Sequence, residues 1–148
     1  MAEKSDEEFR RLSLESRILE QRAEAIQSRI NMVSAVIADL NYSSVTLEGL
    51  EKERENAELL IPIGGESYAK ARLVTPDKVI VGIGAGVSVE KRLQEAKEIM
   101  KKRLEDLERT RAALQQQFVQ VVDMINKNRE SVERLISETR EGKAQQNV

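Results

Sequence analysis

The chain contains no cysteine, no histidine and no tryptophan among its 148 residues. Without cysteine it has no disulfide and no thiolate for a metal ion. Without histidine it lacks the commonest general base and the commonest nitrogen ligand of zinc. Its aromatic residues are two tyrosines and two phenylalanines, too few to anchor a large compact core. The composition therefore favours an extended helical protein over a globule.

Charge is abundant but balanced, with 24 basic and 26 acidic residues and a net charge of −2. No basic patch is present that would grip phosphate groups, so nucleic acid is not expected as a partner. The charged N-terminal stretch is followed by no apolar run, unlike a signal peptide, and no segment approaches the roughly 18 apolar residues of a membrane span. We therefore expect a cytoplasmic protein with no membrane partner.

A seven-residue apolar repeat begins at Phe9, after a polar start at residues 1–8 that is expected to be flexible. Its positions alternate by three and four residues, which is the seam of a coiled coil. One set is Leu12, Leu19, Ile26, Val33, Leu40 and Leu47, and the other is Phe9, Ser16, Ala23, Ile30, Ile37 and Ser44. No proline interrupts the pattern, so a coiled-coil helix is predicted over residues 9–56.

A second heptad pattern predicts another coiled-coil helix over residues 91–140, followed by a disordered tail at residues 141–148. With about 42–48 residues in each regular helix, at 1.5 Å per residue, each would be about 65–70 Å long. Because the lengths match, an antiparallel pair joined through the middle segment is the simplest arrangement. In a register in which facing residue numbers sum to 144, Phe9 meets Leu135, and Ser16 faces Asn128 in one polar layer.

The middle segment, residues 57–90, has a different composition. It holds both prolines and, with Gly49 just upstream, six of the seven glycines, and it is rich in valine and isoleucine. Such a segment is typical of short strands and tight turns. Strands are expected at residues 59–63, 67–74 and 79–83, with a short fourth at 87–89, separated by turns at 64–65, 75–78 and 84–86.

This short segment of strand and turn is too small to bury a core alone, and its edges would carry unpaired backbone groups. The run Val79-Ile80-Val81 nevertheless suits burial on both faces. Pairing with the same segment of other subunits would cover it, and closure into a barrel would remove the edges. The predicted fold is mainly α with a small β insert: a long antiparallel two-helix coiled coil joined by β-hairpins that assemble into an oligomeric β-barrel.

The motifs of the middle segment also carry a resemblance to a known family. They are Pro62-Ile63-Gly64 at a strand end, Tyr68 in the second strand, the apolar run of residues 79–83, Gly84-Ala85-Gly86, and then Val89-Glu90-Lys91. Between two coiled-coil helices of this length, these motifs resemble the alpha-class subunit of prefoldin, the archaeal and eukaryotic chaperone. The resemblance covers the whole architecture, although its specific residues lie only within the middle segment.

The resemblance implies two β-hairpins in the subunit and a hetero-hexamer of two alpha and four beta subunits. It further implies that unfolded client proteins are held by the distal regions of the coiled coils and delivered to a group II chaperonin. No nucleotide or other cofactor is expected. The residues expected to join the subunits are Leu59, Ile61, Ile63, Tyr68, Leu73, Val79, Val81 and Ile83.

No catalytic constellation emerges from the sequence. Gly82, Gly84 and Gly86 are spaced like part of a nucleotide-binding loop, but no Gly-Lys-Ser/Thr follows them and no βαβ unit surrounds them. Acidic pairs such as Glu7-Glu8 and Glu105-Asp106 are typical of a solvated helix surface in a highly charged chain. We therefore expect no enzyme activity.

Apolar residues near the free ends of the two helices are the candidate client-binding site. They are Phe9, Leu12, Leu14, Ile18, Leu19, Val132, Leu135 and Ile136. Leu14 and Ile18 lie off the seam, and exposed apolar groups often mark a binding surface. Single leucines are also ordinary on protein surfaces, so two functions stay open. The first is an ATP-independent holdase chaperone, and the alternative is a structural coiled-coil adaptor that tethers specific partners.

Overall fold

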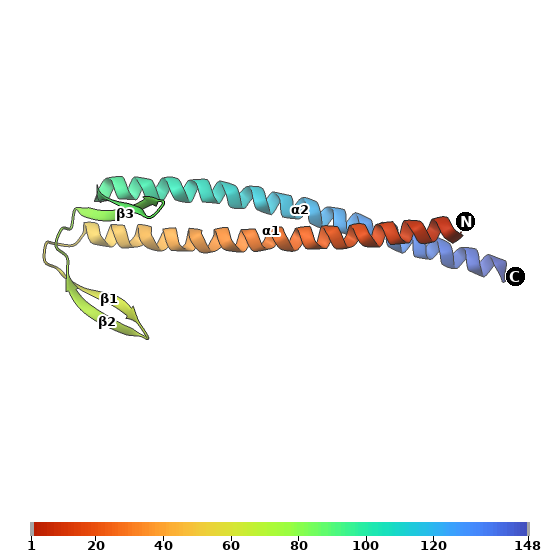
Figure 1. The fold of residues 1–148 in the computed structure, drawn as a ribbon, viewed down its shortest axis with the longest axis horizontal. Coiled ribbons are helices and arrows are strands. Elements are labelled where there is room, and N and C mark those ends of the chain that lie inside the picture. Colours follow the sequence, from red (N-terminus) through yellow and green to blue (C-terminus); the bar gives the residue numbers. More distant parts are fainter. Residues whose placement is uncertain (1, 148) are drawn as a thin grey trace. The chain divides into compact units, whose positions relative to one another are not determined.

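The computed structural model describes residues 2–147 and contains two long helices with two β-hairpins between them. The elements in chain order are α1 (Ala2–Glu51), β1 (Glu58–Gly64), β2 (Ser67–Arg72), β3 (Lys78–Gly84), β4 (Val87–Arg92) and α2 (Leu93–Gln146) (Figure 1). The chain divides into two compact units. The terminal unit runs up to Ser34 and resumes at Arg109, and the hairpin unit is Ala35–Glu108.

The core of the terminal unit is the seam between α1 and α2. Leu19, Ile26 and Ile30 of α1 pack with Leu114 and Val121 of α2, and all five are buried. Half-buried Ala23, Val33, Phe118 and Ile125 surround them. These residues occupy the heptad positions of the sequence, so one apolar stripe on each helix is enough to hold the pair together.

The register of this seam is marked by one side-chain contact between the helices. The hydroxyl oxygens of Ser5 and Thr139 lie 3.5 Å apart. Their residue numbers sum to 144, as in the register expected from the sequence. Phe9 and Leu135, which that register also pairs, line one pocket. The two helices of this unit therefore run in opposite directions, and the first turns of α1 contact the last turns of α2.

Each hairpin is an antiparallel strand pair closed by a two-residue turn. The central residues have positive φ in both turns: 56° and 59° at Gly65 and Glu66, and 51° and 74° at Ala85 and Gly86. Two-residue turns of this kind match the natural twist of paired strands. The two hairpins implied by the resemblance are therefore present, each pairing only within itself among the described residues.

The second hairpin, β3 with β4, is fixed to the helices of the hairpin unit. Val81 is 2% exposed and packs in a buried cluster with Leu47, Leu93 and Ala96. The guanidinium Nη2 of Arg103 donates a hydrogen bond to the Gly82 carbonyl at 2.6 Å. The backbone N–H of Leu93 donates to the Asp77 carbonyl at 2.8 Å, joining the start of α2 to the residue before β3. Packing and hydrogen bonds together hold this hairpin against its own chain.

The structure corrects several expected boundaries. Helix α1 begins at Ala2, within the stretch expected to be a flexible start, and ends at Glu51 rather than near Asn56. Helix α2 begins at Leu93 and continues to Gln146, through most of the expected tail. The fourth strand extends to Arg92, because β3 pairs with it along its whole length. Met1 and Val148, also assigned to the flexible ends, lie outside the described residues.

The expected polar layer is only half formed. Asn128 is buried, with 6% of its surface exposed, but neither its Oδ1 nor its Nδ2 has a hydrogen-bond partner among the described residues. Ser16, expected to face it, is half-buried. Ser16 makes no hydrogen bond to this carboxamide. The terminal unit therefore contains one polar core position with unmet hydrogen-bonding capacity.

Candidate functional site

The eight expected client-binding residues lie in the terminal unit but differ in exposure. Leu14 and Ile18 are open to solvent, with exposed fractions of 60% and 56%. Phe9 and Ile136 are also exposed, and Val132 and Leu135 are half-buried. Leu12 and Leu19 are buried in the seam. Six of the eight residues can therefore contact another molecule directly, and the two buried leucines instead support the helix pair.

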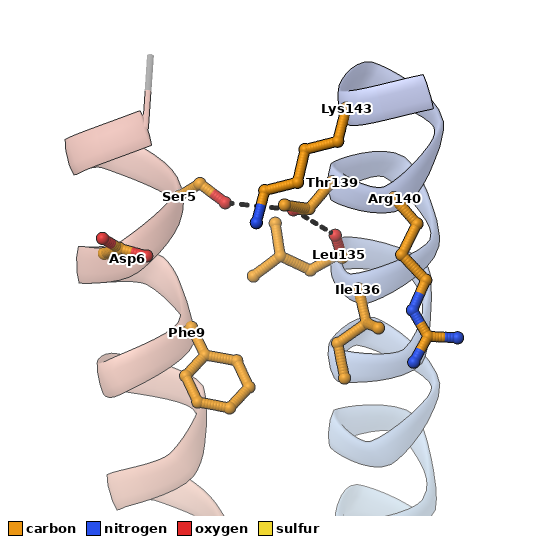
Figure 2. A pocket seen from close by; sticks show the side chains of 8 residues that line it. All are labelled: Ser5, Asp6, Phe9, Leu135, Ile136, Thr139, Arg140 and Lys143. Atoms are coloured by element: carbon orange, nitrogen blue, oxygen red, sulfur yellow. Dashed lines mark hydrogen bonds between the residues drawn. The ribbon is translucent and has the colours of Figure 1, made fainter. Parts of the chain in front are cut away.

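Phe9 and Ile136 share a pocket near the chain ends. Its volume is about 200 Å³, and its apolar wall is Phe9, Leu135 and Ile136. Figure 2 shows the Phe9 ring directed from α1 toward α2, with Ile136 directed back toward it. Phe9 occupies a seam position and is exposed, and Leu135 of α2, which lines the same pocket, is only half-buried. The last layers of the seam are thus incompletely closed, which leaves apolar surface accessible.

The same pocket has a polar rim of Ser5, Asp6, Thr139, Arg140 and Lys143. The Thr139 hydroxyl donates to the Leu135 carbonyl at 2.8 Å. Because a hydroxyl has one hydrogen, the contact between the two hydroxyls is donated by Ser5. Both hydroxyl hydrogens are therefore already used within the protein.

Leu14 and Ile18 form a second apolar feature of the terminal unit. They are four residues apart on α1, so their side chains are neighbours on one helix face. That face is separate from the seam, in which Leu12 and Leu19 are buried. The sequence identified these two residues because they are apolar but fall outside the heptad positions.

The residues expected to join subunits lie in the hairpin unit. On the first hairpin Ile61, Ile63 and Tyr68 are exposed, and Leu59 is half-buried. Half-buried Leu73 follows β2 and accepts a backbone hydrogen bond from Asn56 at 2.7 Å. Among the described residues, no side chain of β1 or β2 belongs to a buried cluster. This hairpin therefore presents apolar side chains that its own chain leaves uncovered.

Strand β3 departs from the expectation that both of its faces need another subunit. Val81 is buried and Val79 half-buried against the chain's own helices, while Ile83 and Ile80 are exposed, Ile80 by 78%. Val81 is therefore a residue of the chain's own core and not one free to contact a partner. Ile80 was not among the residues expected to join subunits, but its side chain is exposed and can contact a partner.

A groove beside Ile80 was also missed from the sequence. It has a volume of about 280 Å³ and is lined by Tyr42, Ser43, Thr46, Leu47, Val79, Ile80, Val81, Ala96 and Met100. Tyr42 is 73% exposed. The sequence feature that could have indicated this groove is a tyrosine outside the heptad positions, because such a residue is not needed in the seam.

Two further findings concern the described residues. No helix within residues 2–147 is long and apolar enough to cross a membrane. No group of three or more histidine, cysteine, aspartate or glutamate residues in the same range is placed to hold a metal ion.

Residues 19–140 match the family model described as "Prefoldin subunit". The chain belongs to the prefoldin family. It is similar to the prefoldin subunit alpha of Methanosarcina barkeri, at 36% identity over 110 residues that cover 72% of this chain and 76% of that relative. It is also similar to the prefoldin subunit alpha of Methanopyrus kandleri, at 34% identity over 123 residues that cover 80% and 78%.

A solved structure has the same architecture. The cryo-electron microscopy structure of filamentous PFD from Methanocaldococcus jannaschii matches with a TM-score of 0.64 and 26% identity, covering 75% of this chain and 92% of that one. The expected resemblance to the prefoldin alpha class is confirmed, as is a fold of two long helices with two hairpins between them. Membership of the prefoldin family implies a chaperone role.

Proposed function

We propose that this chain is the subunit of an ATP-independent holdase that captures non-native polypeptides at the terminal unit. The observation that carries the proposal is the exposure of Leu14 and Ile18 beside seam leucines that are buried. Buried leucines at positions 12 and 19 already hold the helices together, so the exposed pair is not needed for the fold. Exposed apolar side chains of this kind suit binding to the apolar segments of unfolded chains.

Capture would depend on several weak contacts rather than on one tight site. The surface proposed for capture on one chain is small: it consists of the exposed residues Phe9, Leu14, Ile18 and Ile136 and a pocket of about 200 Å³. Several subunits that contact one client at once raise the effective concentration of the later contacts, and the avidity then exceeds each single affinity. No step of this mechanism uses nucleotide, because release takes place by transfer to a second chaperone.

The assembly that brings several terminal units together would form through the hairpin unit. Exposed Ile61, Ile63 and Tyr68 of the first hairpin and Ile80 and Ile83 of the second are among the apolar side chains available for it. As the family resemblance implies, the chain would assemble with beta-class subunits as two alpha and four beta chains. We further propose that the complex works in the cytoplasm and delivers its clients to a group II chaperonin.

The test is suppression of aggregation of a chemically unfolded model protein by the assembled complex, without nucleotide. The informative variant is Leu14→Ser with Ile18→Ser. The matched control is Met32→Ser with Val36→Ser, another exposed apolar pair four residues apart on α1. We expect the first variant to assemble normally and to lose most of its suppression, and the control to keep it.

The contrary outcome would favour the adaptor. If the Leu14 and Ile18 variant suppresses aggregation as well as the control does, clients do not bind at this face. If even the unmodified complex suppresses nothing while it still assembles, the chain acts as a structural coiled-coil adaptor with specific partners.

A further inference from the structure

The pocket between Phe9 and Ile136 is of a size for one side chain. Its volume is about 200 Å³ and its apolar wall comes from three side chains. An enclosed apolar cavity of about 150 Å³ holds one benzene molecule. The pocket therefore fits a single aromatic or branched aliphatic side chain and not a longer apolar stretch.

The rim of the pocket has the opposite charge to the chain as a whole. It carries Arg140 and Lys143 against Asp6, a net charge of +1 from two cations and one carboxylate, whereas the chain has a net charge of −2. Within residues 2–147, neither Arg140 nor Lys143 has a carboxylate within 4.0 Å, since the ion pairs found there involve Arg11, Lys70 and Lys97. Both cations are therefore free to pair with a bound ligand.

The unused hydrogen-bond donors on the rim, like its positive charge, favour a negatively charged ligand. The hydroxyl of Thr139 is used by the Leu135 carbonyl and that of Ser5 by Thr139. The side-chain donors left over are those of Lys143 and Arg140. Figure 2 shows the Lys143 side chain directed toward Ser5 and Thr139, while Arg140 lies on the far side of Ile136. A ligand that fills the apolar pocket thus meets cationic donors at its edge, which favours an acceptor with negative charge.

We propose that this pocket selects client segments in which a large apolar side chain stands next to an acidic residue. The inference rests on the proposed function, because it names the class of segment that the terminal unit binds. The apolar side chain enters between Phe9 and Ile136, and the neighbouring carboxylate pairs with Lys143 or Arg140. Segments that place a lysine or arginine beside the apolar residue are disfavoured by like-charge repulsion.

The experiment measures binding of labelled unstructured peptides to the assembled complex by fluorescence anisotropy. The peptides are identical except for the residue after one phenylalanine, which is glutamate, glutamine or lysine. All are amidated at the C-terminus, so that the side chain supplies the added carboxylate. At low salt we expect the glutamate peptide to bind about two- to five-fold more tightly than the glutamine peptide, the range for exposed ion pairs. The lysine peptide should bind most weakly, and 0.5 M salt should remove the differences.

Variants of the chain test whether the preference for the glutamate peptide comes from the cations on the pocket rim. Arg140→Gln with Lys143→Gln should make the glutamate and glutamine peptides bind equally, without weakening the glutamine peptide. Lys127→Gln with Arg134→Gln removes the same charge from exposed positions of α2 that do not line the pocket. This control should keep the preference.

Two results would overturn the proposal. One is equal binding of the three peptides by the unmodified complex, and the other is a preference that survives loss of Arg140 and Lys143. In either case client capture still stands if Leu14→Ser with Ile18→Ser abolishes suppression of aggregation. If the complex binds none of the peptides and suppresses no aggregation, the proposed function fails together with the selectivity.

Discussion

Ile80 and Val81 are neighbours on β3, yet Ile80 is 78% exposed and Val81 is 2% exposed. The two faces of this strand therefore have different roles. Val81 fixes the hairpin to the helices through Leu47, Leu93 and Ala96. Ile80 lies beside the groove near Tyr42, on the face that the chain leaves open.

This difference predicts separable effects of two adjacent substitutions. Val81→Ala should lower the free energy of unfolding by about 2 kcal/mol, because it removes two buried methyl groups and leaves a cavity. Ile80→Ser should change the stability of the isolated chain little but weaken its assembly. Thermal unfolding followed by circular dichroism and sedimentation velocity measure the two effects. Equal loss of assembly in both variants, with no difference in stability, would contradict this division of roles.

The contact between Ser5 and Thr139 predicts a specific cross-link. The chain has no native cysteine, so Ser5→Cys with Thr139→Cys introduces a single pair. Because the two hydroxyl oxygens are 3.5 Å apart, mild oxidation should form an intramolecular disulfide readily. Ser5→Cys with Val132→Cys is the control. It displaces the partner by one heptad, about 10 Å along the helix, and should not cross-link. Faster cross-linking of the control would refute the register.

We predict that replacing Asn128 with an apolar residue stabilises the protein. Its carboxamide is buried without a hydrogen-bond partner among the described residues. Asn128→Leu should therefore raise the free energy of unfolding by about 1–2 kcal/mol, since a buried unsatisfied polar group is costly. Chemical denaturation measures the change. A destabilised Asn128→Leu variant would mean that the carboxamide is paired when the protein is in solution.

The contacts of Glu51 lead us to predict that the stability of the fold depends on pH. It accepts hydrogen bonds from Lys97 and from Gln94, the latter at 2.8 Å. Lys97, followed by Gln94, lowers the pKa of the Glu51 carboxyl below its ordinary value of 4.5. A lowered pKa in the folded state stabilises the fold above pH 4.5, and this contribution is lost as the pH falls through the folded-state pKa.

The corresponding comparison is between the unmodified chain and Glu51→Gln. At pH 7 the variant should have the lower melting temperature, and the difference should disappear as the pH falls through the folded-state pKa of Glu51, which lies below 4.5. Lys52→Gln serves as the control, because Lys52 contributes only weakly to the pKa of Glu51. A difference between the two chains that does not vary with pH would contradict the role of the Glu51 charge.

Much of the fold could be predicted because its patterns are local. A heptad specifies which face of each helix is buried, and Leu19, Ile26 and Ile30 were all placed correctly on the seam. The ends of the helices could not be predicted in the same way. Residues 2–8 are polar and lack the apolar period, so helix formation there depends on continuation from the paired segment that follows.

The site could be predicted only in part, because exposure depends on distant segments. Leu14 and Ile18 were identified because they break the heptad. Val81 was assigned to a partner interface because an apolar strand gives no sign of what will cover it. Its cover is supplied by Leu47 and Ala96, from two different helices. The bond from Arg103 to the Gly82 carbonyl likewise joins residues that no sequence motif connects.

Site-specific photo-cross-linking tests client capture most directly. A photoreactive amino acid is placed at position 14, 18 or 136 in the terminal unit, or at exposed position 45 in the hairpin unit as the control. The assembled complex is then irradiated with an unfolded client in the absence of nucleotide. Strong cross-links to the client from positions 14, 18 and 136, and few from position 45, are the predicted result. Cross-links of equal yield from all four positions, or none from the terminal unit, would contradict the account.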